Sequence, residues 1–228
     1  MSTLYIVGTP IGNLGDITLR ALEVLKEVDV ILCEDTRVTK KLLNHYGIKK
    51  ETISYHAHSG PSKVKRAIEL LKSGKNLAVV SCAGTPGISD PGGVLVKSIR
   101  EEVPEAKIVT VPGPSALIAI LSISGLPSSD FLFLGFLPHK RGRETLFKEM
   151  AESKRTIVFY ESPHRIIKTL KSLTKNLTIY RKVGVGRELT KIYEEFVSGT
   201  PTEILGYFEE NKEKQKGEFV VVVSPKLR

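Results

Sequence analysis

The amino-acid sequence predicts an α/β protein with two α/β domains. The N-terminal one has a mostly parallel sheet with flanking helices, and the C-terminal one a mixed sheet with helices. Three observations predict this fold class. The chain has 228 residues, long for one domain and comfortable for two. Apolar runs of strand length alternate with segments of helical periodicity. Loops rich in glycine and proline follow three of these runs.

Four apolar runs in the first half have the length of buried strands: residues 4–7, 30–33, 77–81 and 108–111. Helical patterns lie between them. After Pro61, the residues Val64, Ala67, Ile68 and Leu71 follow the i, i+3, i+4, i+7 spacing of a buried helix face. This order predicts a parallel sheet covered by helices. Ligands of such sheets bind beyond the carboxyl ends of the strands.

The second half mixes strands and helices less regularly. The predicted strands are residues 131–135, 156–160, 183–185, 193–197 and 219–223. The predicted helices are residues 143–152, 163–173 and 201–208. We place the domain boundary within 115–125, which gives domains of residues 1–118 and 119–228.

Charge and composition restrict the function classes. The net charge is +9, and residues 139–191 hold 14 basic and 5 acidic residues, as expected of a surface that binds a phosphate backbone. A solvated basic face is the alternative. Cys33 and Cys82 have no histidine or second cysteine at ligand spacing, so we expect neither a metal site nor a disulfide. No run reaches the roughly 20 apolar residues of a membrane span, and no signal peptide is evident, so we expect a cytoplasmic protein without membrane contact.

The three loops after strands are the least ordinary part of the sequence: residues 8–13, 83–92 and 112–116. Glycine allows a ligand to approach the backbone closely, and proline fixes the course of a loop. One such loop is an ordinary turn, but three at one sheet edge predict a preformed pocket. The loops match neither G-x-G-x-x-G, Walker A nor G-x-S-x-G, which argues against a dinucleotide site, a P-loop and a hydrolase elbow.

Seven motifs in order carry a family resemblance: V-G-T-P-I-G-N at 7–13, C-E-D-T-R at 33–37, A-G-T-P-G-I-S-D-P-G at 83–92, V-P-G-P-S-A at 111–116, E-S-P-H-R at 161–165, G-R-E-L-T-K at 186–191 and K-G-E-F-V at 216–220. With these motifs the chain resembles the 16S ribosomal RNA (cytidine-2'-O)-methyltransferases of the tetrapyrrole methylase superfamily. One departure is Cys82, where that family usually has an acidic residue.

The resemblance implies a two-lobed homodimer that holds S-adenosylmethionine in a cleft between its domains. It implies methylation of a cytidine 2'-oxygen in the small ribosomal subunit or its RNA, without a metal. In the superfamily, the first strand exit, the A-G-T-P-G-I loop, the P-S-A turn and C-terminal segments contact the cofactor. Carried onto this chain, the cofactor-binding residues are Pro10, Thr85, Ile88, Ser115, Ala116, Tyr160, Leu189 and Glu218.

A ribose hydroxyl is a poor nucleophile, so a carboxylate near the pocket could accept its proton during methyl transfer. The carboxylates on the expected pocket loops are Glu34, Asp35, Asp90, Glu161 and Glu188. We take Asp90, Glu161 and Glu188 as the catalytic candidates. Asp90 leads because it lies in the longest of the glycine- and proline-rich loops, although aspartate there is also an ordinary turn former.

Basic residues in the same motifs are the candidates for substrate binding. Arg37, Arg165 and Arg187 could position phosphate or ribose through forked donors, or could form ion pairs with Glu34, Glu161 or Glu188. Lys140, Arg141 and Arg143 follow Pro138-His139 in a segment expected to be an exposed loop, where RNA docking is favoured over a merely solvated charge run.

Two other functions are compatible with parts of the sequence. A methyltransferase acting on carbon atoms of a corrinoid or porphyrin precursor would share the fold, but its compact substrate needs a local basic cluster rather than an extended basic segment. A non-catalytic RNA-binding module of ribosome assembly would explain the charge. It would not explain three glycine- and proline-rich strand exits at one pocket.

Overall fold

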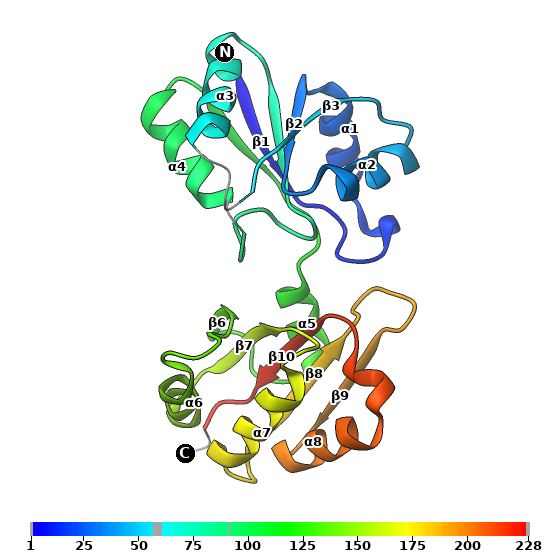
Figure 1. The fold of residues 1–228 in the computed structure, drawn as a ribbon, viewed down its shortest axis with the longest axis vertical. Helices are drawn as coiled ribbons and strands as arrows, with labels where there is room; N and C mark the ends of the chain where they lie inside the picture. Colours follow the sequence, from blue (N-terminus) through cyan, green and yellow to red (C-terminus); the bar gives the residue numbers. More distant parts are fainter. Residues whose placement is uncertain (1, 57–60, 91, 227–228) are drawn as a thin grey trace. The chain divides into compact units, whose positions relative to one another are not determined.

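The computed structural model describes residues 2–56, 61–90 and 92–226. The chain forms two compact units, Met1–Ser115 and Ala116–Arg228 (Figure 1). The second unit begins with helix α5 (Ala116–Ser124). The boundary expected after residue 118 lies inside this helix. Among the described residues, no helix is long and apolar enough to cross a membrane.

The first unit is built on a five-stranded sheet in which every neighbouring pair is parallel. In sheet order, its strands are β3 (Glu51–Ser54), β2 (Val30–Cys33), β4 (Leu77–Val80), β1 (Thr3–Val7) and β5 (Lys107–Val111). Four of them match the predicted runs. The edge strand β3, with sequence Glu-Thr-Ile-Ser, lacks the apolar run of a buried strand and was not predicted.

Helices cover both faces of this sheet. They are α1 (Leu19–Glu27), α2 (Thr36–His45), α3 (Pro61–Lys72) and α4 (Gly92–Glu102), and a 3-10 turn, η1 (Leu14–Asp16), precedes α1. Leu4 packs in a core with residues of α3 and α4, whereas Val7 of the same strand packs in a second core with residues of α1 and α2. Strands buried on both faces explain the continuous apolar runs in the sequence.

The second unit has a mixed sheet, as the sequence predicts. In sheet order, its strands are β6 (Phe131–Phe136), β7 (Thr156–Glu161), β10 (Phe219–Val223), β8 (Val183–Arg187) and β9 (Glu195–Gly199). Only β6 and β7 are parallel; the other neighbouring pairs are antiparallel.

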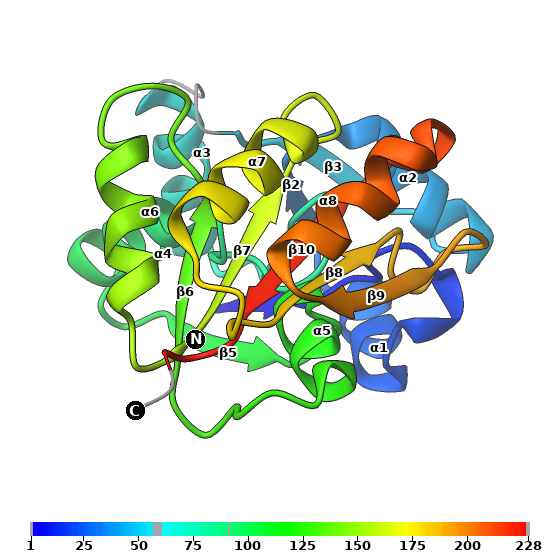
Figure 2. The same ribbon diagram turned by 90° about the horizontal axis from the view of Figure 1, so that it is seen from below.

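Three helices pack on one core with the inward residues of this sheet and lie side by side in Figure 2: α6 (Arg143–Glu152), α7 (Ile166–Asn176) and α8 (Pro201–Glu210). Helix α5 packs against β10. A capping box formed by Thr200 and Glu203 begins α8, and a 3-10 turn, η2 (Lys212–Gln215), follows it. The two-domain α/β fold class is therefore confirmed.

Candidate functional site

The three glycine- and proline-rich loops lie at one edge of the first unit's sheet, because β4, β1 and β5 are adjacent and parallel. Backbone hydrogen bonds join the loops directly. The N–H of Gly8 donates to the carbonyl of Val111 at 2.9 Å. Thr9 and Gly84 exchange two backbone hydrogen bonds at 3.0 and 3.1 Å, which form an isolated antiparallel bridge. The predicted convergence of these strand exits is confirmed.

Gly8 and Gly113 explain why two of these loops need glycine. A Cβ atom on Gly8 would lie 2.7 Å from the Cα of Gly113, and one on Gly113 would lie 2.9 Å from the Cα of Gly8. Real Cβ atoms essentially never approach backbone so closely. The third loop joins this contact, since the hydroxyl of Thr85 donates to the carbonyl of Pro114 at 3.3 Å. The loops therefore form one tightly packed frame.

The longest loop, residues 83–92, is closed by Asp90. Its Oδ1 accepts the N–H of Gly87 at 2.7 Å and the N–H of Gly92, the first residue of α4, at 2.8 Å. Gly84, Gly87 and Ser89 in this loop have φ of +80°, +88° and +65°. Asp90 thus holds a strained loop and the start of α4 together through one carboxylate oxygen.

Four of the predicted cofactor-binding residues lie on these loops. Pro10 is buried, Thr85 and Ser115 are half-buried, and Ile88 exposes 44% of its surface. The frame thus combines fixed backbone polar groups with a solvent-facing aliphatic side chain. That combination fits a ligand that has both polar and apolar parts.

The exit of β2 carries a separate acidic cluster. Asp35 caps α2 by accepting the N–H of Arg37 at 2.8 Å, and its other oxygen lies 2.7 Å from the Arg37 guanidinium. These hydrogen bonds lower the pKa of Asp35 to about 2. Arg37 therefore pairs with Asp35 and not with Glu34 as considered from the sequence, and its side chain remains 87% exposed.

Cys82 belongs to the same cluster. Its thiol donates a hydrogen bond to Glu34, and partial burial of the sulfur together with the Glu34 carboxylate raises the pKa of Cys82 to about 11. The residue that replaces an acidic side chain in the family pattern is thus a protonated thiol at neutral pH. It contacts Glu34 without adding a third carboxylate beside Glu34 and Asp35.

Alkylation of Cys82 by iodoacetamide is expected to be slow at neutral pH, because only the thiolate reacts. With a pKa of about 11 instead of about 8.5, the thiolate fraction at pH 8, and with it the rate, should be roughly 200-fold below that of an ordinary surface cysteine. The rate should keep rising with pH towards 11. Glu34→Gln should lower the pKa and accelerate alkylation at pH 8. Mass spectrometry in a Cys33→Ala background measures both rates, and a reaction midpoint near pH 8.5 would contradict the assignment.

In the second unit, three motifs that are distant in the sequence meet at one sheet edge. The end of β7, the end of β8 and the start of β10 are neighbours, because Phe219 is in register with both Glu161 and Arg187. This edge gathers Tyr160, Glu188, Leu189 and Glu218 from the predicted site. The sequence could not show that the three motifs meet, because their contact depends on the sheet order β7-β10-β8.

Glu188 organises the loop after β8. Its backbone N–H donates to the carbonyl of Glu218 at 2.9 Å, and its Oε1 accepts the N–H of Glu218 at 2.8 Å and the ammonium of Lys191 at 2.9 Å. Burial raises the pKa of Glu188, but these hydrogen bonds outweigh it and hold the pKa below its ordinary value. Glu188 has the left-handed φ of +51°, and Leu189 beside it is buried. The loop is therefore held by ionic contacts.

Glu161 is fully buried in a network of donors. Arg165 lies 2.8 Å from its Oε1, which also accepts the N–H of Ser162 at 2.8 Å. The hydroxyl of Thr169 donates to Oε2 at 2.5 Å and accepts from Arg143 at 2.6 Å. Arg143 is 4% exposed, so the expectation that it lies in an exposed loop is wrong. Its charge is tolerated inside because Glu161 lies 3.6 Å away.

The remaining basic and aromatic candidates are more accessible. Arg187 donates to the carbonyls of Lys216 at 2.8 Å and Tyr193 at 3.2 Å. Lys140 and Arg141 are exposed, as expected. Tyr160 packs edge-on against Phe133 and Phe136, with ring centroids 5.0 and 5.5 Å apart.

The family of tetrapyrrole (corrin/porphyrin) methylases matches residues 3–205. This chain belongs to the tetrapyrrole methylases. Curated relatives named ribosomal RNA small subunit methyltransferase I match nearly the whole length of this chain. The protein of Thermotoga maritima is 48% identical over 99% of this chain and 100% of its own, and that of Vibrio cholerae is 48% identical over 96% and 76%. The resemblance inferred from the motifs is confirmed.

Solved structures agree with the fold of this methylase. The crystal structure of the methyltransferase CobJ has a TM-score of 0.71 at 18% identity, covering 99% of this chain and 95% of that one. A uroporphyrin-III C-methyl transferase from Thermus thermophilus, complexed with S-adenyl homocysteine, has a TM-score of 0.66 at 20% identity and 97% coverage of both chains. At these identities the likeness concerns the fold alone.

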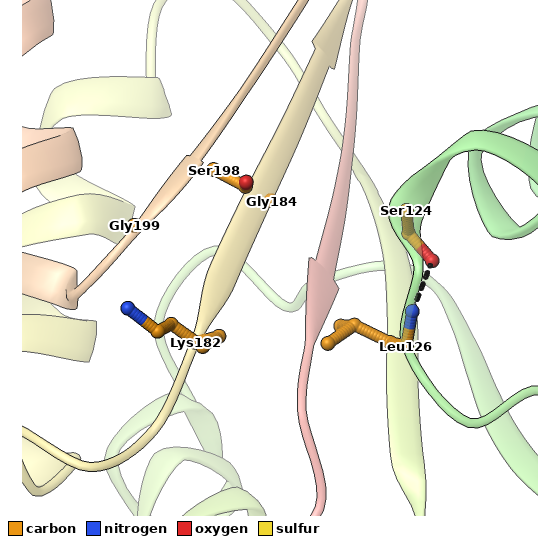
Figure 3. Close-up of a pocket in the computed structure, with 6 residues that line it drawn as sticks. All are labelled: Ser124, Leu126, Lys182, Gly184, Ser198 and Gly199. Atoms are coloured by element: carbon orange, nitrogen blue, oxygen red, sulfur yellow. Dashed lines mark hydrogen bonds between the residues drawn. The ribbon is translucent and has the colours of Figure 1, made fainter.

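One cavity of this methylase is lined by none of the predicted site residues. It has a volume of about 180 Å³ and is lined by Ser124, Leu126, Lys182, Gly184, Ser198 and Gly199 (Figure 3). These residues come from the end of α5, the start of β8 and the end of β9, whereas the three motifs meet at the opposite end of β8. Within the described parts of the chain, no group of three or more His, Cys, Asp and Glu residues could hold a metal ion.

Proposed function

We propose that this tetrapyrrole methylase transfers a methyl group from S-adenosylmethionine to the 2'-oxygen of a cytidine in 16S ribosomal RNA. The observation that carries the proposal is the 48% identity, over practically the whole of both chains, to a relative named ribosomal RNA small subunit methyltransferase I. The seven motifs resemble the cytidine-2'-O group in particular. We further propose a cytoplasmic homodimer whose substrate is the small subunit or its RNA.

The loop frame of the first unit fits S-adenosylmethionine, which supplies an electrophilic methyl group on a sulfonium. In this proposal Pro10, Thr85, Ile88 and Ser115 hold the cofactor. The close contact of Gly8 with Gly113 keeps their backbone groups fixed before the ligand arrives, which lowers the ordering cost of binding. Ala116, Tyr160, Leu189 and Glu218 remain the proposed contacts from the second unit.

Among the three catalytic candidates, Asp90 fits the role of proton acceptor best. Both of its loop-closing hydrogen bonds use Oδ1, so Oδ2 takes part in neither. Both oxygens of Glu161 receive donors inside the core. Glu188 is bound to Lys191, and its lowered pKa weakens it as a base. We therefore assign proton acceptance to Asp90 and structural anchoring to Glu161 and Glu188.

Asp90→Asn is expected to lower kcat by about 100-fold, in the range typical of a lost general base. The asparagine keeps an oxygen for the N–H groups of Gly87 and Gly92, so the loop and thermal stability should be preserved. Asp90→Ala should also destabilise the loop. Rates of methyl transfer at saturating cofactor measure the effect. A fully active Asp90→Asn variant would restrict Asp90 to its structural role.

Arg37, Lys140 and Arg141 are the proposed substrate contacts with exposed side chains, and Arg187 is half-buried. The guanidinium of Arg37 is 87% exposed although it pairs with Asp35. Arg165 is also a substrate-binding candidate from its sequence motif, but its ion pair with buried Glu161 supports a structural role instead. Forked donors on exposed side chains suit phosphate oxygens, and Arg37 would exchange its partner on binding.

The decisive experiment supplies methyl-labelled S-adenosylmethionine and small ribosomal subunits that lack the modification. Nuclease digestion then identifies the labelled nucleotide. Label in 2'-O-methylcytidine supports the proposal. Absence of label from subunits and from free RNA, with cofactor binding intact, would overturn it and turn the search to tetrapyrrole substrates. Loss of cofactor binding itself would leave only a non-catalytic RNA-binding module.

A further inference from the structure

The solvent-facing side of α7 carries a row of cationic side chains. His164 precedes the helix, and Lys168, Lys171 and Lys175 follow at intervals of four, three and four residues, which places them on one helix face. All four are exposed. Together with Ile167 and Ser172 they line a shallow hollow of about 510 Å³. These three lysines and His164 are called the α7 stripe below.

The lysines of the stripe repel one another along the helix, although Lys175 in the last turn interacts favourably with the helix dipole. None of the eleven residues of α7 is acidic, so no carboxylate within the helix offsets the lysines. Like charges three and four residues apart cost a few tenths of a kcal/mol each in a helix. Only Lys171 has an ion pair among the described residues, at 3.0 Å to Glu209 of α8, and both side chains are about half exposed. A charge pattern that opposes helix stability points to an anionic partner.

The stripe continues into the exposed basic loop at residues 139–141. Arg165, which begins α7, donates to the carbonyl of Leu137 at 2.8 Å, and Arg143 donates to the carbonyl of Pro138 at 3.0 Å. Both arginines are held by buried Glu161. The network therefore fixes the loop with Lys140 and Arg141 beside the start of α7. The loop at residues 139–141 and the α7 stripe are together called the basic track below.

We propose that this basic track binds the phosphate backbone of the RNA substrate. The proposal rests on the proposed function and adds the surface that holds the substrate. From Lys168 to Lys175 the helix rises about 10 Å. Over that length one strand of a nucleic-acid duplex presents about three phosphates, given one charge per roughly 3.4 Å. The lysines thus match a short stretch of strand in spacing as well as in sign.

The test compares variants of this chain by their salt-dependent binding to a fragment of small-subunit ribosomal RNA. The first is Lys168→Gln with Lys171→Gln and Lys175→Gln. Its matched control replaces three exposed lysines of α3 in the first unit, Lys63, Lys65 and Lys72, by glutamine, with the same change in net charge. Glutamine and lysine have similar helix propensities, so both variants should fold. Circular dichroism and cofactor binding verify this.

The stripe variant is expected to bind RNA roughly tenfold more weakly near 150 mM salt. The slope of log K against log salt should fall in magnitude by about 2, since each phosphate contact contributes roughly 0.7 to 0.9. The α3 control should change neither quantity comparably. Equal behaviour of the two variants, or a slope unchanged by the stripe variant, would overturn the proposal. Loss of binding to phosphatidylserine vesicles without loss of RNA binding would also overturn it, in favour of a lipid surface.

A third variant tests the track by gain of affinity. Glu209→Gln removes the ion pair of Lys171 and should strengthen RNA binding about two- to fivefold, with a steeper salt dependence. Glu210→Gln, the next residue of α8, is its charge-matched control and should have a smaller effect. Methyl transfer by the wild-type chain is assayed in parallel. Absence of methyl transfer would reject the proposed function. Normal methyl transfer, together with unchanged RNA binding by the stripe variant, would reject only the proposal that the basic track binds RNA.

Discussion

Glu161→Gln is expected to lower the free energy of unfolding by about 3–5 kcal/mol. The substitution keeps the shape of the side chain. It removes the carboxylate that, among the described residues, forms the ion pairs of Arg143 and Arg165, whose side chains are 4% and 14% exposed. Breaking a buried ion pair from one side leaves an uncompensated charge in a low-dielectric site, which is among the most destabilising single changes. Thermal unfolding should shift down by roughly 10 °C.

Two further variants make this result specific. Glu144→Gln changes the same charge at an exposed position of α6 and should leave stability within about 0.5 kcal/mol. Combining Arg143→Met with Glu161→Gln should cost less than the sum of the two single changes. Arg143, which Glu161→Gln alone leaves buried without its carboxylate, is absent from the double variant, so that only Arg165 loses its ion pair. Strict additivity would show that the network is not coupled as its distances indicate.

Gly113→Ala is expected to destroy the loop frame of the first unit. The added methyl would lie 2.9 Å from the backbone of Gly8, so the exits of β5 and β1 must separate. The backbone atoms of Gly8 cannot relieve this clash by a rotamer change, as a side chain could. We expect a loss of about 3 kcal/mol or more and no measurable binding of S-adenosylmethionine in calorimetric titration.

The control for this prediction lies in α4. A Cβ on Gly93 meets nothing within 4 Å, and this glycine is helical, so Gly93→Ala should preserve binding and stabilise the chain by up to about 1 kcal/mol. Unimpaired cofactor binding by Gly113→Ala would contradict the role assigned to the loop frame. Impaired binding in both variants would point instead to general sensitivity of the segment.

Sequence patterns predicted the fold wherever burial was strong. The strands of the first unit that are buried on both faces have continuous apolar runs, whereas the edge strand β3 exposes polar residues and has no such signal. The convergence of the three strand exits was also predictable. Glycine and proline mark each loop, and parallel strands end at one edge.

The site was less predictable, because pairing between distant residues decides which charges are free. Arg143 lies in a basic run that is typical of a solvated loop. The neighbouring sequence does not reveal that its guanidinium pairs with Glu161 and donates a hydrogen bond to Thr169 inside the core. The lysines of α7 do have a visible helical spacing. The predicted helix ended at residue 173, however, and so excluded Lys175 from the row.

The position of β10 has a consequence for biosynthesis. This strand is the last of the second unit to be translated, yet it lies at the centre of the sheet, between β7 and β8. The first unit can close its parallel sheet while the rest of the chain is still emerging from the ribosome. The second unit must wait with the facing edges of β7 and β8 unpaired until Phe219–Val223 arrives. A stop codon before this segment would therefore yield an aggregation-prone chain rather than a smaller working enzyme.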